Sequence, residues 1–304
     1  MTTFGGKYSR RLSRQYPGLF VLLLDQSGSM AEQVPSYNCS KADIATSALN
    51  NIIHEMIKNA GFDDYNPGAR KKYAYISIFG YNDSVYPLLT ASGDPVDIAT
   101  LADRPRGVVP VTREIRKGAD IRYVTEKRPY WIEPHSQGRT NMAQAFQRAK
   151  DVVHRWLSTP PLERWQAPRS ESFPPVIINI TDAQHNGSGN PVREAQEIQQ
   201  HYSREGNALV FNCHFTRDAS SPCIFPNNPN DMRRLDNTGL AAMMYEMSST
   251  IPDTLRDDAS RISGSQLPPG ARCFAYNADP DVLIKFLRWG TLAVPFHNEF
   301  EDEE

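Results

Sequence analysis

The sequence lacks the features that mark membrane-spanning, secreted and strongly charged proteins. Its apolar run at 19–24 is too short to cross a bilayer, and the polar, basic start at 1–15 does not resemble a secretion signal. The formal net charge of −2 gives no basic field for nucleic acid or an anionic membrane. We therefore expect a cytoplasmic protein with no nucleic-acid partner and no membrane partner.

Cysteine is scarce, and its spacing matches neither a C-x-x-C pair nor a common zinc pattern. Free thiols in a reducing compartment are the simplest interpretation. Cys213, in the apolar run 208–215, is expected to lie in the core. The hydrophobic share of 39% over 304 residues is enough for one large domain with a well-filled core. The four cysteines are Cys39, Cys213, Cys223 and Cys273.

Several catalytic signatures are also missing. The chain has no G-x-x-x-x-G-K-S/T string and no strand followed by G-x-G-x-x-G, which argues against nucleotide binding. Phosphotransfer through an aspartate nucleophile needs a second carboxylate two residues later, where this chain has Ser27 after Asp25. Ser29 does not lie in a G-x-S-x-G elbow. We therefore expect a protein that is not an enzyme.

What the sequence does have is an apolar run that ends in closely spaced oxygen donors. Residues 20–24 read as a strand buried on both faces, and Asp25, Ser27 and Ser29 follow directly. In an open α/β sheet, ligands bind at the carboxyl ends of the strands. Small oxygen donors crowded around Gly28, which permits a tight turn, suit a hard cation such as Mg²⁺. Taken alone, the same string is more typical of a capped helix start than of a metal site.

Two more segments place an oxygen donor beside a predicted element. Thr140 precedes a helical pattern, and Asp182 follows the apolar run 176–180. Individually, an ordinary helix N-cap and an Asx turn explain them. Their combination with the first string is harder to explain by turn chemistry.

The D-x-S-x-S string followed by a Thr and then an Asp resembles the metal-ion-dependent adhesion site (MIDAS) of von Willebrand factor A (vWA) domains. The resemblance covers roughly 16–289 and matches all five positions. It implies a Mg²⁺ or Mn²⁺ site in which the hydroxyls of the two serines coordinate the ion directly, and the threonine does so directly or through water, depending on the conformational state. The aspartates would hold coordinating waters or bind directly in one state, and a partner protein would supply an acidic side chain. The implied metal residues are Asp25, Ser27, Ser29, Thr140 and Asp182.

The chain departs from the commonest family strings at two places. Asn141 stands where related bacterial sequences often have Pro, and Ala183 stands where Gly often follows the Asp. Neither removes an oxygen ligand, so they bear on loop geometry. The resemblance is to the intracellular, bacterial type, which implies a scaffold in a stress-response or defence system with an AAA+ ATPase, kinase or phosphatase as candidate partner.

The alternating pattern predicts an α/β fold: a Rossmann-like three-layer sandwich with a central, mostly parallel sheet and one short antiparallel edge strand. We divide the chain into an N-terminal extension (1–15), a vWA domain (16–290) with an insertion (91–137), and an acidic tail (291–304). A hairpin is expected around 122–124. Predicted strands are 19–24, 73–80, 86–90, 176–180, 208–215 and 273–276, and predicted helices are 41–59, 140–157, 191–203, 240–247, 252–261 and 279–289.

The sequence therefore predicts a divalent-metal-dependent protein-binding module that captures a partner's acidic side chain. The main alternative is a metal-dependent hydrolase, or a subunit of an ATPase, kinase or phosphatase assembly. A structural module with a degenerate, empty site is a third possibility.

Overall fold

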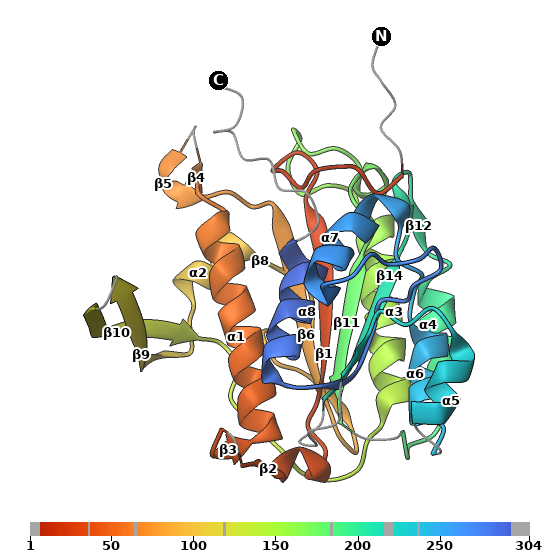
Figure 1. Ribbon diagram of the computed structural model, residues 1–304. Coiled ribbons are helices and arrows are strands. Elements are labelled where there is room, and N and C mark those ends of the chain that lie inside the picture. The colour runs from red at the N-terminus through yellow and green to blue at the C-terminus, as the bar shows by residue number, and fades with distance from the viewer. Residues whose placement is uncertain are drawn as a thin grey trace.

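The fold is built around one twisted sheet with helices on both faces, in a computed structural model that describes residues 7–35, 37–63, 66–117, 120–182, 185–215, 222–235 and 238–292 (Figure 1). Five strands run parallel, in the spatial order β16-β14-β11-β1-β6. Their carboxyl ends therefore meet at one edge of the sheet. The bounds are β1 Gly18–Asp25, β6 Ala74–Tyr81, β11 Val176–Thr181, β14 Leu209–Phe215 and β16 Phe274–Ala278.

The two central strands are buried along their whole length, which explains their unbroken apolar sequence. Alternate residues of β1 point to opposite cores: Phe20 and Leu22 belong to one apolar cluster, Leu19 and Val21 to the other. The first cluster includes residues of α1 (Lys41–Asn59), α7 (Asp253–Ser263) and α8 (Pro280–Leu292). The second includes residues of α3 (Met142–Ser158) and α4 (Pro191–Ile198). A three-layer sandwich results, as predicted.

Local sequence signals define the helix starts that matter for the site. Ser40 caps α1, accepting a hydrogen bond from the Asp43 amide while the Asp43 carboxylate accepts one from the Ser40 amide. Asn190 caps α4, with Pro191 at its first position. An apolar stripe that includes Phe146, Val153 and Trp156 packs α3 onto the sheet.

The structure has more short antiparallel strands than the single one predicted. β7 (Val85–Pro87) and β8 (Val96–Asp97) both pair with β6, and β15 (Cys223–Ile224) pairs with β16. Two short helices, α2 (Ile98–Asp103) and α5 (Pro229–Leu235), lie in segments for which no helix was predicted. Helix α4 ends at Ile198, five residues before the predicted end at 203. The sequence pattern of these short elements was too weak to predict them, because tertiary contacts rather than hydrophobic periodicity determine their structure.

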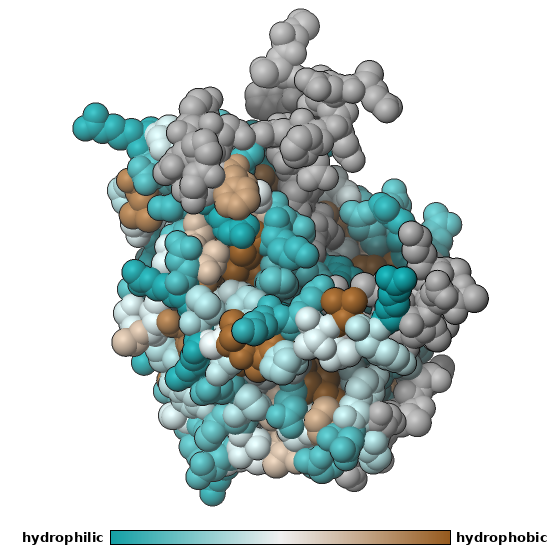
Figure 2. All heavy atoms as spheres, turned by 90° about the vertical axis from the view of Figure 1, so that its left-hand side faces the viewer, coloured by the Kyte–Doolittle hydropathy of each residue, from teal (hydrophilic) through white to brown (hydrophobic). Residues whose placement is uncertain are grey.

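The segment predicted to be an insertion contains the hairpin expected around 122–124. It pairs β9 (Gly107–Lys117) with β10 (Asp120–Tyr130) and extends away from the sheet, at the left of Figure 1. Figure 2 shows the face on that side, where apolar side chains gather in separate patches among hydrophilic ones. Val108 and Tyr123 are among the exposed apolar side chains of this hairpin.

Smaller elements complete the fold. Residues 7–15 of the predicted N-terminal extension pack on the body: Leu12 is buried, and the Tyr8 amide donates to the Glu205 carbonyl. Residues 293–304 of the predicted tail lie outside the described residues. Among the helices that are described, none is long and apolar enough to cross a bilayer. The remaining elements are η1 Gly28–Ala31, β2 Gln33–Val34, β3 Cys39–Ser40, β4 Phe62–Asp63, β5 Asn66–Arg70, η2 Arg169–Glu171, β12 Tyr202–Ser203, β13 Gly206–Asn207 and α6 Leu240–Met247.

The cysteines are free thiols, as expected, and Cys213 is fully buried in the core. Cys273 is buried in the neighbouring strand region. Burial raises the pKa of both thiols, so neither is a reactive thiolate near neutral pH.

Candidate metal site

The first donors lie on the turn after β1. The Asp25 side chain is fully buried, and its Oδ1 accepts a hydrogen bond from the Ser27 amide at 2.8 Å. Its Oδ2 accepts a hydrogen bond from the Thr181 hydroxyl, at the end of the neighbouring strand β11. Burial raises the pKa of the Asp25 carboxyl to about 6, although the hydrogen bonds from Thr181 and Ser27 lower it.

The serines and the second aspartate form one cluster. Ser27 Oγ and Ser29 Oγ are 3.1 Å apart, and Ser29 Oγ donates to Asp182 Oδ1 at 2.7 Å. The Asp182 side chain is fully buried. Because β1 and β11 are adjacent and parallel, their ends bring Ser29 and Asp182 together across 153 positions of sequence.

Hydrogen bonds donated by backbone amides hold the Thr140 loop beside this cluster. The Gly28 amide donates to the Gly138 carbonyl at 2.9 Å, which ties the first loop, the turn after β1, to the second loop, which carries Thr140. The Asn186 Oδ1 accepts a hydrogen bond from the Thr140 amide at 2.7 Å, which ties the second loop to the third loop, which follows β11. Thr140 itself is 1% exposed. All five residues predicted from the sequence thus lie at the same edge of the sheet.

Glycine is required where the loops approach closely. At Gly138, φ is +79°, and an added Cβ would lie 2.1 Å from Asp83 Oδ2. At Gly80, an added Cβ would lie 2.0 Å from Gln26 Oε1, which accepts a hydrogen bond from the Tyr86 hydroxyl. The side chain of Gln26 therefore runs across β6 and fixes the turn that carries the first donors.

Lys41 is part of this site, although the sequence analysis did not identify it. Its Nζ lies 2.7 Å from Asp182 Oδ2 and 2.8 Å from Glu32 Oε2, and its side chain is 7% exposed. Burial lowers the pKa of Lys41, but its hydrogen bonds to Asp182 and Glu32 outweigh this and raise the pKa. A signal was present: lysine at the first position of a helix is unfavourable beside the helix dipole.

The donor set fits a small hard cation. Among the described residues, no group of three or more His, Cys, Asp or Glu side chains could hold a metal. The cluster instead combines hydroxyls with the Asp25 and Asp182 carboxylates. Mg²⁺ prefers oxygen ligands and keeps several waters, so it needs few direct protein ligands. A softer metal would favour imidazole or thiolate, and none of the five predicted residues carries either group.

The first departure from the family strings, Asn141, contacts residues on either side of the Thr140 loop. The Asn141 amide donates to the Asn82 carbonyl at 2.9 Å, and an added Cβ at Gly187 would lie 2.6 Å from Asn141 Oδ1. Asn141 thus packs against the third loop, where a glycine leaves room for it. The second departure, Ala183, lies outside the described residues.

The sequence matches the von Willebrand factor type A domain family over residues 20–184, more than half of the chain. The chain therefore belongs to this family, whose domains are protein-interaction modules. No curated protein is significantly similar to it in sequence.

Solved structures that resemble the chain are distant in sequence. A von Willebrand factor type A protein from Catenulispora acidiphila is 12% identical, with a TM-score of 0.37 over 81% of this chain and 49% of that one. The pilus adhesin SpaC from Lactobacillus rhamnosus GG is 11% identical, with a TM-score of 0.46 over 95% and 31%. Proximal thread matrix protein 1 from the mussel byssus, with a zinc-occupied MIDAS motif, is 13% identical, with a TM-score of 0.35 over 67% and 37%. The chain spans about half or less of each of these proteins.

Proposed function

We propose that the chain is a divalent-metal-dependent protein-binding module. Ser27, Ser29 and Thr140 would hold Mg²⁺ or Mn²⁺ through their hydroxyls, with Asp25 and Asp182 in support. The ion would supply a positive centre for an acidic side chain of a partner protein. The observation that carries the proposal is the 2.7 Å hydrogen bond from Ser29 to Asp182, which joins two separate loops into one oxygen-lined cluster.

The charges around the cluster favour capture of an outside carboxylate. Asp182 already shares one oxygen with Lys41, so part of its negative charge is neutralised within the protein. A cation bound directly by hydroxyls, with both carboxylates holding coordinating waters, would stay electrophilic. A partner's Asp or Glu would complete its shell, and contacts to the surrounding loops would supply specificity.

We further propose that binding occurs without catalysis. The position two residues after Asp25, where aspartate-based phosphotransfer needs a carboxylate, is Ser27, and its Oγ contacts Ser29. The biological setting that we propose is a scaffold or adaptor in a cytoplasmic, bacterial stress-response or defence system. A candidate partner there is an AAA+ ATPase, a kinase or a phosphatase.

The first test is direct metal binding. Titration of Mn²⁺, followed by electron paramagnetic resonance, should show one site that Thr140→Ala and Ser27→Ala weaken at least about tenfold. Ser170→Ala, an exposed serine on the same chain, should bind Mn²⁺ as the wild type does. Equal Mn²⁺ binding by Thr140→Ala and the wild type would overturn the proposed site.

The second test is metal-dependent capture. Partners recovered from native lysate on the immobilised wild-type chain with Mg²⁺ should be lost in EDTA and on the Asp25→Ala chain. Recovery that is unchanged in EDTA would contradict the binding mechanism. Hydrolysis of phosphoesters that depends on both Mg²⁺ and Asp25 would replace it with the enzymatic alternative.

A further inference from the structure

A separate cavity lies at the opposite edge of the sheet from the metal site. It has a volume of about 280 Å³ and is lined by residues that include Tyr75 on β6, Trp156 on α3 and Arg169 on η2. Tyr75 lies near the start of β6, whereas the metal site is at its end, about 20 Å away for a strand of this length. The cavity is therefore remote from the proposed metal.

Most of the lining is apolar. Besides the two aromatic rings it includes Val152, Pro160 and Leu162. Leu162 is 72% exposed, so its apolar surface is accessible to a ligand. The volume of the cavity is at the small end of the range for ligand pockets, which favours a small molecule over a nucleotide.

The unusual group in this cavity is Arg169. It is 4% exposed, and its guanidinium stacks on the Trp156 ring at 4.0 Å and on the Tyr75 ring at 5.1 Å. It forms a hydrogen bond with the Tyr75 side chain but no ion pair with a carboxylate among the described residues, and its Nη1 has no hydrogen-bond partner there. The other deeply buried cation, Lys41, contacts two carboxylates. A buried charge without an opposite charge is costly, so Arg169 has unmet capacity for an anion.

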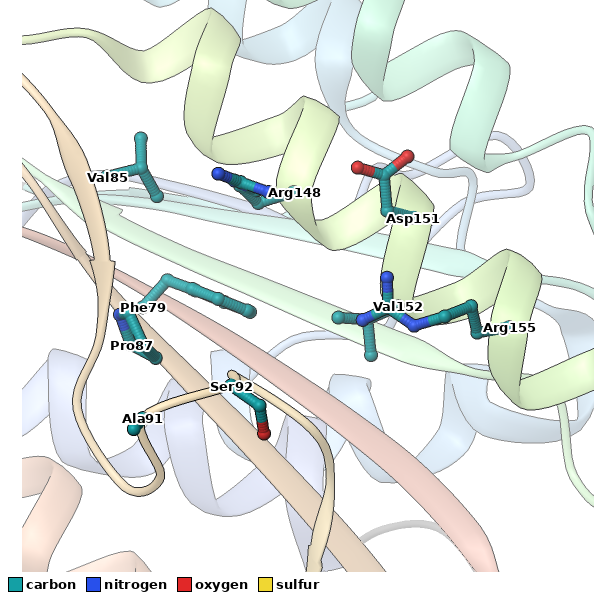
Figure 3. Close-up of a pocket in the computed structure, with 9 residues that line it drawn as sticks. All are labelled: Phe79, Val85, Pro87, Ala91, Ser92, Arg148, Asp151, Val152 and Arg155. Atoms are coloured by element: carbon teal, nitrogen blue, oxygen red, sulfur yellow. The ribbon is translucent and has the colours of Figure 1, made fainter.

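The surroundings of the cavity leave the charge of Arg169 uncompensated. Arg155 lies at its rim, 3.6 Å from the exposed carboxylate of Asp94. Arg155 also lines a smaller neighbouring cavity of about 140 Å³, shown in Figure 3, together with Arg148. In that view the Phe79 ring extends toward Val152, and the Asp151 carboxylate points away from both. One carboxylate against two arginines leaves the larger cavity with a net positive lining.

We propose that this cavity binds a small carboxylic acid with an aromatic or branched apolar body, whose carboxylate pairs with Arg169. The apolar body would lie against Trp156, Val152 and Leu162. Such a ligand supplies the opposite charge that the guanidinium lacks and removes apolar surface from water. The site does not depend on metal binding at the other edge of the sheet.

The test uses the full chain and phenylacetate as a probe, with phenylacetamide as its uncharged analogue. Isothermal titration calorimetry in EDTA should show that the wild-type chain binds phenylacetate at least about tenfold more tightly than phenylacetamide. The reason is that a hydrogen bond to a charged group is worth that factor or more. Arg169→Met should abolish phenylacetate binding. Arg148→Met removes the same charge from the neighbouring cavity and should leave the affinity within about threefold.

The thermal unfolding midpoint separates a ligand-binding role from a structural one. Without ligand, Arg169→Met should be at least as stable as the wild type, because it removes a buried charge that has no carboxylate partner. Lower stability combined with retained phenylacetate binding would make Arg169 a structural residue and overturn the proposal. If this variant fails to fold, the comparison of phenylacetate with phenylacetamide on the wild type decides.

Two further results would overturn the proposal. One is equal affinity for phenylacetate and phenylacetamide. The other is that the wild type binds none of phenylacetate, benzoate and 4-methylpentanoate. Binding of a peptide carboxylate in place of these small acids would also overturn the proposal. Loss of Mn²⁺ binding has no bearing on either result, so failure here is distinguishable from failure of the proposed metal site.

Discussion

The Lys41 ammonium lies 2.7 Å from Asp182 Oδ2, while the other oxygen of the same carboxylate accepts a hydrogen bond from Ser29. Asp182 therefore has a positive charge on one side and a hydroxyl on the other. A metal at this site would share Asp182 with Lys41, so we expect the lysine to weaken the attraction of the site for a cation.

Replacing Lys41 with methionine should raise the affinity for Mn²⁺ by roughly tenfold, because it removes a repulsive charge close to the ion. The metal-free variant should be less stable than the wild type, since buried Asp182 loses its partner. Mn²⁺ titration and thermal unfolding in EDTA measure the two effects. Lys58→Met, at the exposed end of the same helix, is the matched control. Weaker metal binding by Lys41→Met would show instead that Lys41 holds Asp182 in place.

The raised pKa of Asp25 predicts a dependence on pH. In the metal-free protein the folded state binds this proton more tightly than the unfolded state, whose Asp pKa is about 3.9. The contribution of Asp25 to the free energy of unfolding is therefore full below about pH 4 and falls as pH rises to about 6, by up to about 3 kcal/mol. Urea unfolding in EDTA between pH 4 and 7, compared with Asp25→Asn, measures it.

The same proton competes with the metal. Below about pH 6, binding of a cation has to displace the Asp25 proton. The apparent Mn²⁺ affinity should therefore fall as pH falls, and the fall should approach about tenfold for each pH unit. The measurement is Mn²⁺ titration at several pH values between 5 and 7.5. An affinity that does not change across this interval would mean that Asp25 is already ionised in the metal-free protein.

Gly138→Ala should weaken the metal site through loop geometry. Its φ of +79° costs alanine about 1 kcal/mol, and the added methyl group displaces Asp83 from the loop that carries Thr140. Gly61→Ala is a close control, because φ there is +61° and the space around it is open. Both variants should lose similar stability in urea, whereas only Gly138→Ala should bind Mn²⁺ several-fold more weakly. Equal Mn²⁺ affinities for the two variants would refute the role of this loop.

A buried polar chain beneath the site should contribute to stability. Asn179 Oδ1 accepts from the Tyr81 hydroxyl at 2.8 Å, and its Nδ2 donates to Asn212 Oδ1 at 3.0 Å. Asn179→Ala removes a hydrogen-bond partner from both buried groups and should cost about 2–4 kcal/mol in urea unfolding. Tyr202→Phe, which removes an exposed hydroxyl, should cost less than about 0.5 kcal/mol. A similar small loss for both would show that Tyr81 and Asn212 find other partners.

Much of the fold could be predicted because its strands and helices carry strong local patterns. The apolar run before Asp25 is a buried central strand, as predicted. Helix α1 has the predicted bounds, and Ser40 together with Asp43 forms the cap at its start. Short elements such as α2 and β8 escaped prediction because they contain too few residues to show a period. Their positions depend on pairing and packing with β6 and α1.

The sequence by itself determined which oxygen donors the chain carries and that each follows or adjoins a sheet strand or helix. Only the tertiary structure decided that Ser29 touches Asp182, because parallel pairing of β1 with β11 brings together loops that lie far apart in the chain. It also decided that Lys41 is buried between Glu32 and Asp182 while Arg169 is buried without a carboxylate. The physical reason is that burial and charge pairing are properties of neighbours in space, and a linear pattern specifies only neighbours along the chain.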